Sequence, residues 1–238
     1  MDARSVELGA MTLPALLVLS AATALAVFLA TPAVLRRLPE PTGDTGAATG
    51  DGADVKVPYA ALATRRFAAI LGVLAAAAVA TAALTQPPTV LPGWLVLATL
   101  GLLLAAIDAR TTWLPLPLTR VAWVAMGVAT AAGAILGGWA QLLRGLGGFL
   151  AAGAVFGVIW LVTRGGIGFG DVRFAPLVGA ATAAGSWSLL AAALVLGSLA
   201  GALVGLVRLA AGRRGAFAYA PSILAGAYLA AVVTWLTT

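Results

Sequence analysis

Residues 67–85 read FAAILGVLAAAAVATAALT, an apolar run that contains no charged residue. An α-helix needs about 20 predominantly apolar residues to cross the hydrocarbon core of a bilayer, and this run has that length. Similar runs recur along the whole chain, and the sixth of them is the shortest. We expect membrane-spanning helices at residues 11–35, 67–85, 90–107, 117–137, 145–163, 172–184, 187–207 and 219–237.

The composition supports an all-α, polytopic membrane bundle of about eight transmembrane helices. Of the 238 residues, 62% are hydrophobic and only 9% are charged, and the mean hydropathy is +1.05. A soluble domain carries roughly 25% charged residues, so this chain lacks the charge that a water-exposed surface requires. Alanine and glycine are abundant, and such small residues let membrane helices approach closely. We therefore expect a single membrane domain over residues 1–238.

The basic residues predict how the bundle is oriented. The first apolar run is too long for a signal peptide, and its positive charges follow it, so we expect a retained span with the N-terminus outside. The segments that then face the cytoplasm hold twelve of the 14 Lys and Arg residues, with Arg4 and Arg144 outside. This bias predicts a plasma membrane protein with both termini extracytoplasmic. The twelve residues are Arg36, Arg37, Lys56, Arg65, Arg66, Arg110, Arg120, Arg164, Arg173, Arg208, Arg213 and Arg214.

The segment between the first two spans, residues 38–64, differs in composition from the rest of the chain. It is rich in Gly, Thr and Asp and has few large apolar residues, which favours a flexible cytoplasmic loop over a folded domain. We expect its carboxylates to be solvated. They are Glu40, Asp44, Asp51 and Asp54.

The residue types that are missing exclude several chemistries. The chain has no cysteine and no histidine, which excludes disulfides, thiol nucleophiles, histidine-based triads and imidazole metal sites. The net charge of +6 comes from basic residues scattered between apolar runs, not from the basic stripe of a nucleic-acid-binding protein. Carboxylates are then the side chains best suited to acid–base chemistry at neutral pH, and we expect no metal and no cofactor.

Only two of the eight acidic residues lie in or beside a predicted span. Asp108 ends the third span, and Asp171 begins the sixth, so the predicted topology puts both at the cytoplasmic edge of the bilayer. An aspartyl hydrolase needs such a pair, because one carboxylate takes a proton from water while the other, protonated, polarises the scissile carbonyl. Two carboxyl groups in close approach share one proton. The sequence therefore predicts Asp108 and Asp171 as a catalytic pair.

Structural roles are the alternative for each aspartate. Asp171 precedes a helix and is placed to cap it, and Asp108 is placed to pair with Arg110. However, a helix C-terminus disfavours a negative charge, and ionisable residues in a membrane are candidates for function by default. A proton-coupled transporter is a further alternative, but it would favour ionisable groups near the midplane and symmetric halves with interrupted helices. Neither is visible in the sequence.

Three segments together resemble a known family, the type IV prepilin peptidases. The first has Ile-Asp at 107–108, followed by Leu-Pro at 114–115 and Leu-Thr at 118–119. The second is Gly-Phe-Gly-Asp-Val-Arg at 168–173, similar to the family's G-x-G-D-V-K motif. The third is the proline-centred Ala-Pro-Ser-Ile-Leu-Ala at 220–225. Their order and spacing match those of the family, and the resemblance covers residues 90–238.

This resemblance implies a membrane aspartic endopeptidase with Asp108 and Asp171 as its catalytic residues. It implies that Gly168 and Gly170 shape the backbone around the second aspartate. Arg173 stands where the family usually has Lys, with a supporting role at most; anchoring at the membrane edge is the structural alternative. The implied substrates are prepilin or pseudopilin precursors, cut at the cytoplasmic face just before their hydrophobic helix.

The chain departs from the family pattern in two places. A secondary aspartate of the family falls at Leu116, so an assisting charge is lost there. Many members also carry a cytoplasmic domain with paired Cys-x-x-Cys motifs after the first span, which accompanies methylation of the new N-terminus. Here a short cysteine-free loop takes its place. We expect peptidase activity without N-methyltransferase activity, and a non-catalytic homologue that acts in pilus or secretion assembly remains the alternative.

Overall fold

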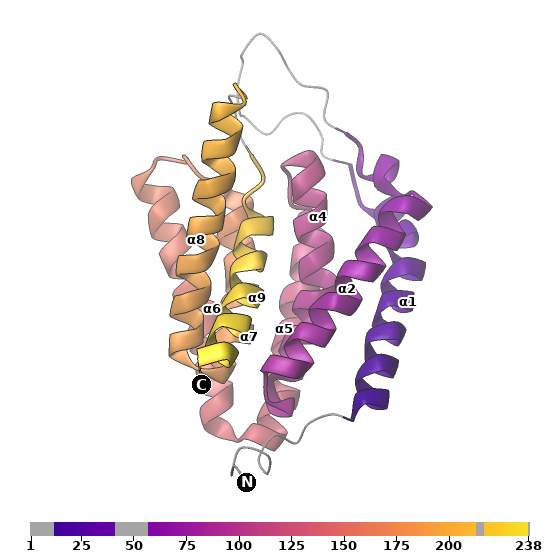
Figure 1. The fold of residues 1–238 in the computed structure, drawn as a ribbon. Helices are drawn as coiled ribbons and strands as arrows, with labels where there is room; N and C mark the ends of the chain where they lie inside the picture. Colours follow the sequence, from indigo (N-terminus) through magenta and orange to yellow (C-terminus); the bar gives the residue numbers. More distant parts are fainter. Residues whose placement is uncertain (1–11, 41–56, 213–216, 238) are drawn as a thin grey trace.

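The computed structural model describes residues 12–40, 57–212 and 217–237, which form an antiparallel helical bundle with eight crossings (Figure 1). Within these ranges the chain forms no β-strand. The elements are α1 (Leu13–Arg37), η2 (Tyr59–Leu62), α2 (Arg65–Thr85), η3 (Pro88–Val90), α3 (Leu91–Val96), η4 (Leu97–Gly101), α4 (Leu102–Thr111), α5 (Leu116–Gly137), α6 (Trp139–Val162), α7 (Phe169–Gly185), α8 (Trp187–Ala210) and α9 (Ala220–Thr237).

The prediction of a polytopic helical membrane bundle is confirmed. Seven of the eight crossings are long and apolar enough to span a bilayer. The remaining crossing is α7, the short sixth span of the prediction, which has 17 residues. Every residue from Phe174 to Ala184 on this helix is buried, and α7 packs against α5, α6, α8 and α9. A helix that is apolar on all sides belongs in a bundle interior, so α7 forms the centre of the fold.

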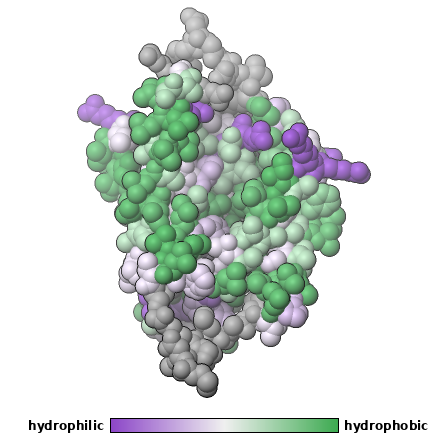
Figure 2. Space-filling model, viewed as in Figure 1, coloured by the Kyte–Doolittle hydropathy of each residue, from purple (hydrophilic) through white to green (hydrophobic). Residues whose placement is uncertain are grey.

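The outer surface has the character of a protein solvated by lipid. Large apolar side chains point outward along the crossings, and Val73, Val124 and Ile135 are 70%, 69% and 85% exposed. Figure 2 shows hydrophobic side chains over much of the visible face, with hydrophilic side chains projecting near the upper end. An apolar surface of this extent would aggregate in water. The chain is therefore a multi-pass membrane protein.

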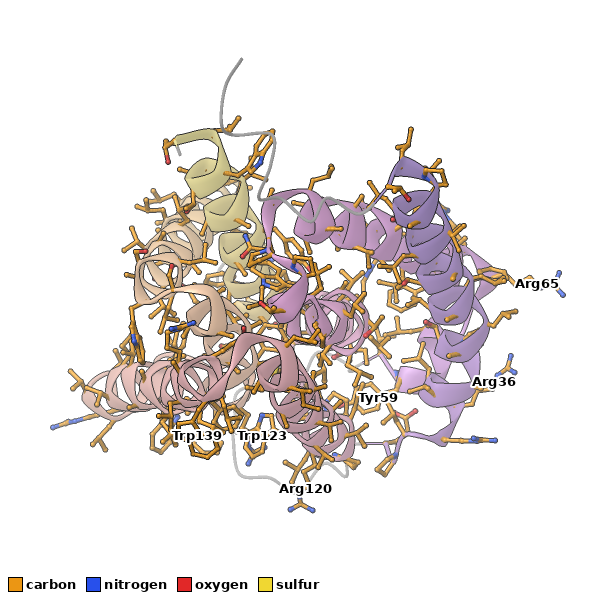
Figure 3. The ribbon with its side chains drawn as sticks, turned by 90° about the horizontal axis from the view of Figure 1, so that it is seen from below. Arg36, Tyr59, Arg65, Arg120, Trp123 and Trp139 are labelled. Carbon is orange, nitrogen blue, oxygen red and sulfur yellow. The ribbon has the colours of Figure 1, made fainter. Side chains whose placement is uncertain are left out.

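One end of the bundle, which we call the aspartate end, carries most of the basic side chains. It is formed by the end of α4 and the starts of α7 and α9, together with the other helix ends at the top of Figure 1. Nine of the ten arginines within the described ranges belong to it, and Arg144 belongs to the opposite end. Arg36, Arg65 and Arg120 project from the periphery of the bundle (Figure 3).

The third crossing is assembled from four short pieces, η3, α3, η4 and α4. Prolines at 87, 88 and 92 shape its start, because a proline fits the first turn of a helix but not its interior. Residues Leu97–Gly101 form a π-helical turn, which shifts the register of the helix that follows. Such turns often lie near functional sites, and this one directly precedes the helix that carries Asp108.

The segment 38–64 is described at both of its ends. Glu40 is exposed, as expected for this loop, but its carboxylate oxygens also accept hydrogen bonds from the backbone N–H of Tyr59 (2.9 Å) and Ala60 (3.1 Å). These bonds hold the start of η2 against the end of α1. Tyr59 itself is buried at 2% exposure. The predicted flexible stretch, with the carboxylates at 44, 51 and 54, lies outside the described residues.

The Tyr59 phenol predicts a loss of stability at high pH. Burial, aided by the negative charge of Glu40, raises the pKa of Tyr59 to about 12. The neutral phenol is therefore favoured in the folded protein, and its contribution is complete below pH 10 and lost as the pH rises toward 12. We expect the melting temperature to fall across this window. The Tyr59→Phe variant, which has no proton to lose, should fall less; equal losses in both proteins would contradict this assignment.

Close contact between α6 and α7 depends on glycine. A Cβ atom on Gly148 would collide with the backbone oxygen of Gly179 and with Ala183, and a Cβ on Gly179 would collide with the backbone of Gly148. We expect Gly148→Val to destabilise the protein by about 1–3 kcal/mol or more, because overpacking forces the two helices apart. Gly127→Val is the control, since nothing lies within 4 Å of a Cβ there. Thermal melts in detergent measure both; equal melting temperatures would contradict the prediction.

Candidate functional site

Asp108 lies in the last turn of α4 and is buried, with 5% of its surface exposed. Its Oδ2 atom accepts a hydrogen bond of 3.1 Å from the backbone N–H of Ala220. The predicted structural alternative was an ion pair with Arg110. No such ion pair forms among the described residues, and Arg110 is exposed instead. A main-chain donor, not a cationic side chain, therefore holds this carboxylate.

The donor belongs to the first turn of α9. Ala220 is the first residue of that helix and Pro221 is the second, which suits proline because the N–H groups of a first turn have no partner within the helix. The backbone of Tyr219 also lies close enough to interact with the Asp108 carboxylate. The helix start thus points the Ala220 N–H group and the positive end of its dipole toward a carboxylate.

Asp171 is the third residue of α7 and is likewise 5% exposed. Its carboxylate lies beside the backbone N–H of Gly168, the N-cap residue, and beside that of Ala220. It also interacts electrostatically with Asp108. The structural alternative placed Asp171 before the helix as its N-cap, but Gly168 takes that position and Asp171 lies inside the first turn, within electrostatic range of the other aspartate. The structure brings the two predicted residues together around one main-chain donor.

Both motif glycines leave room for their neighbours. A Cβ on Gly168 would lie 3.2 Å from Oδ2 of Asp171, and one on Gly170 would lie 3.0 Å from Cδ1 of Leu114. Gly168 has φ −64° and ψ 137°, a conformation open to any residue, so space and not backbone freedom requires glycine there. Gly170 also joins the two aspartate motifs physically, because Leu114 follows Asp108 in the first motif.

Arg173 is turned away from the carboxylates. Its guanidinium stacks on the ring of Phe169, 4.6 Å from the centroid, and Phe169 packs edge-on against Trp160. The carbonyl of Arg173 accepts a hydrogen bond of 2.9 Å from the indole N–H of Trp123. Pro176 has no N–H group, so one main-chain hydrogen bond is missing from this turn of α7. The bond from Trp123 lies in the same turn. These contacts brace the first turns of α7, which carry Asp171.

The arrangement provides two buried carboxyl groups that can share a proton, with main-chain N–H groups to stabilise the ionised form. Within the described ranges no group of three His, Cys, Asp or Glu side chains converges, so a metal would have two side-chain ligands at most. Both carboxylates lie at one end of the bundle. A proton relay through a transporter would need them near the middle of the bundle. A pair of this kind is suited to proton transfer to and from a water.

Sequence reasoning missed the contribution of α9. In the sequence, Pro221 indicates only where a helix begins. In the structure, that start delivers the Ala220 N–H to the aspartates. The proline does indicate the first turn of a helix. It does not indicate the hydrogen bond to Asp108, because almost every residue type has a main-chain N–H group. Leu116, where the family's additional aspartate would lie, begins α5 and leaves no third carboxylate in its place.

Residues 95–206 match the model of the type IV leader peptidase family. The matched region contains both aspartates and both motif glycines, and it covers slightly less than half of the 238 residues. It ends before the first turn of α9. No curated protein and no solved structure matches the chain.

Proposed function

We propose, since residues 95–206 match the model of the type IV leader peptidase family, that Asp108 and Asp171 are the catalytic pair of a membrane aspartic endopeptidase. The family match supports a leader-peptidase-like protease in general. The observation that supports the aspartic mechanism is the convergence of α4, α7 and α9. These helices bring two buried carboxylates from distant parts of the sequence to the Ala220 N–H.

In the proposed reaction the pair holds one proton between its two carboxyl groups. The ionised group removes a proton from a water molecule, whose oxygen attacks the scissile carbonyl, while the protonated group donates a hydrogen bond to the carbonyl oxygen. The tetrahedral intermediate then collapses as the amine leaves with a proton from the pair. The two groups titrate as a unit. The Ala220 N–H stabilises the negative charge that moves between them.

The proposed substrates are prepilin-like or pseudopilin precursors. Such a substrate has an apolar helix preceded by a short leader, so its helix can lie in the bilayer while the cleavage point reaches the aspartate end. We further propose that this end faces the cytoplasm, because it carries nine of the ten described arginines and positive charges favour that side. Both termini would then be extracytoplasmic.

Processing by purified protein separates the enzyme from a non-catalytic assembly factor. The full chain is reconstituted into lipid vesicles with a pseudopilin precursor, and mass spectrometry identifies the new N-terminus. We expect one cut immediately before the apolar helix, and no cut in vesicles without the protein. An intact precursor, in the presence of a folded chain, would favour the assembly factor. Mass spectrometry also tests methylation, which we expect to be absent from the new N-terminus.

A further inference from the structure

A cavity opens at the aspartate end, on a different side of α4 from Asp108. It encloses about 350 Å³ between η2, the start of α2 and the end of α4. Its lining residues are Ala61, Leu62, Thr64, Arg66, Phe67 and Arg110. Arg110 lies two positions after Asp108, and residues two apart on a helix point in different directions. The cavity is therefore separate from the proposed catalytic pair.

The described lining of the cavity carries positive charge only. Two guanidinium groups, from Arg66 and Arg110, line it, and no carboxylate of the described residues does. Within the described ranges neither arginine forms an ion pair. Two like charges on the wall of one cavity repel each other, and an anion bound between them would remove that repulsion.

The start of α2 adds further donors for an anion. The Thr64 hydroxyl accepts a hydrogen bond from the Phe67 N–H (3.2 Å), and the Thr64 carbonyl accepts from Ala68. The N–H groups of Arg65 and Arg66 precede the first bond within the helix and have no main-chain partner in the described part of the chain. Unpaired N–H groups at a helix start, beside an arginine, suit the oxygens of a phosphate.

The apolar part of the cavity indicates which molecule carries the phosphate. Leu62 and Phe67 line the cavity beside the arginines. Along α2, Ile70 and Val73 lie four and seven residues after Arg66, on the same helix face, and are 46% and 70% exposed. An acyl chain can lie along these two side chains while its headgroup lies between the arginines. We propose that the cavity binds the phosphate headgroup of an anionic phospholipid.

Such a lipid would link the start of α2 to the end of α4 across the cavity. Arg66 begins α2 and Arg110 ends α4, and the phosphate would bridge them by charge-assisted hydrogen bonds. Basic cavities between membrane helices are a known type of lipid headgroup site. The proposal does not depend on peptidase activity, since none of its groups belongs to the catalytic pair.

The test compares neighbouring arginines in the full chain. Native mass spectrometry measures binding of phosphatidylglycerol and phosphatidylcholine to the wild type and to single variants. We expect the wild type to prefer phosphatidylglycerol, and Arg66→Gln or Arg110→Gln to weaken its binding about tenfold. Arg65→Gln is the matched control: Arg65 is the adjacent residue but points outward (Figure 3) and does not line the cavity. This variant should bind as the wild type does.

Three results would contradict the assignment of an anionic phospholipid to this cavity. Equal weakening by Arg65→Gln would mean that the lipid is attracted only by the general positive charge of this end. Equal binding of the two lipids, both of which carry a phosphate, would exclude a site that selects an anionic headgroup. Displacement of bound phosphatidylglycerol by millimolar inorganic phosphate would retain the phosphate site but assign it to the free ion.

Two further variants control for misfolding and for lipid binding at the catalytic pair. Arg66→Lys keeps the charge, and we expect it to retain part of the binding if the glutamine variant fails to fold, because lysine binds phosphate as a point charge without the paired geometry of arginine. Asp108→Asn should bind the lipid as the wild type does. Loss of binding in that variant would place the lipid at the catalytic pair. If the chain proves not to be a protease, the expected lipid binding of all these variants stays the same.

Discussion

Asparagine at either aspartate is expected to reduce precursor cleavage by about 10²–10⁴-fold, the range that a positioned acid or base contributes. The amide has nearly the same shape as the carboxylic acid but cannot take up a proton from water. It still offers an oxygen, so Asp108→Asn can accept the Ala220 N–H and Asp171→Asn can face the Gly168 N–H. Cleavage should therefore fail in proteins that remain folded. Quantitative immunoblots of a co-expressed precursor, alongside thermal melts, measure both properties.

Glu40→Gln is the matched control for this experiment. It makes the same exchange of carboxylate for amide at the same end of the bundle, and its side chain can still accept a main-chain hydrogen bond at η2. Cleavage by this variant should stay near the wild-type level. Unimpaired processing by both aspartate variants would remove the aspartic mechanism, although the match of residues 95–206 to the leader peptidase family model would stand.

Valine at Gly170 should lower cleavage by about 100-fold. Its side chain would occupy the position of Leu114, whose Cβ and Cδ1 atoms lie 3.3 and 3.0 Å from a Cβ at residue 170. The start of α7 must then shift, and Asp171 shifts with it. A displacement of about 1 Å in a catalytic group costs on the order of 10²-fold in rate. The rate of cleavage under single-turnover conditions measures the loss.

A second substitution tests the cause of that loss. Leu114→Ala removes the Cδ1 and Cγ atoms and leaves only the Cβ atom of this contact, so we expect the double variant to recover part of the cleavage that Gly170→Val loses. A double-mutant cycle expresses this recovery as a coupling between the two residues. Gly127→Val serves as the control for valine in a helix, because its Cβ position is open. Additive losses at 114 and 170 would mean that the glycine acts through something other than this contact.

The fold could be predicted from the sequence to the extent that it depends on apolar length. All eight crossings lie close to their expected positions, and even the shortest, at 172–184, is a helix from Phe169 to Gly185. Helix ends were less accurate, since α6 begins at Trp139 and not at residue 145. The π-helical turn at Leu97–Gly101 could not be predicted, because its residues have no pattern that distinguishes a π-helical turn from an α-helical one.

The candidate site was predictable where side chains define it. Elimination of other chemistries and the spacing of Asp108 and Asp171 led to the pair that the structure brings together. The supporting contacts were not predictable, because they depend on which helices are neighbours. The stacking of Arg173 on Phe169 and the contact between Gly170 and Leu114 follow from how α7 packs in the bundle. The Ala220 donor belongs to the main chain and is the same in every residue type except proline.

That main-chain donor has a consequence for how the site tolerates genetic variation. Any amino acid but proline at position 220 keeps the N–H group, so a point mutation can rarely delete the partner of Asp108. Damage would instead come from insertions, deletions or prolines that move the start of α9. A library of all single substitutions should therefore show sharp intolerance at 108 and 171 but broad acceptance of small residues at 220. An inhibitor that hydrogen-bonds to this N–H would contact a group that resistance mutations cannot easily remove.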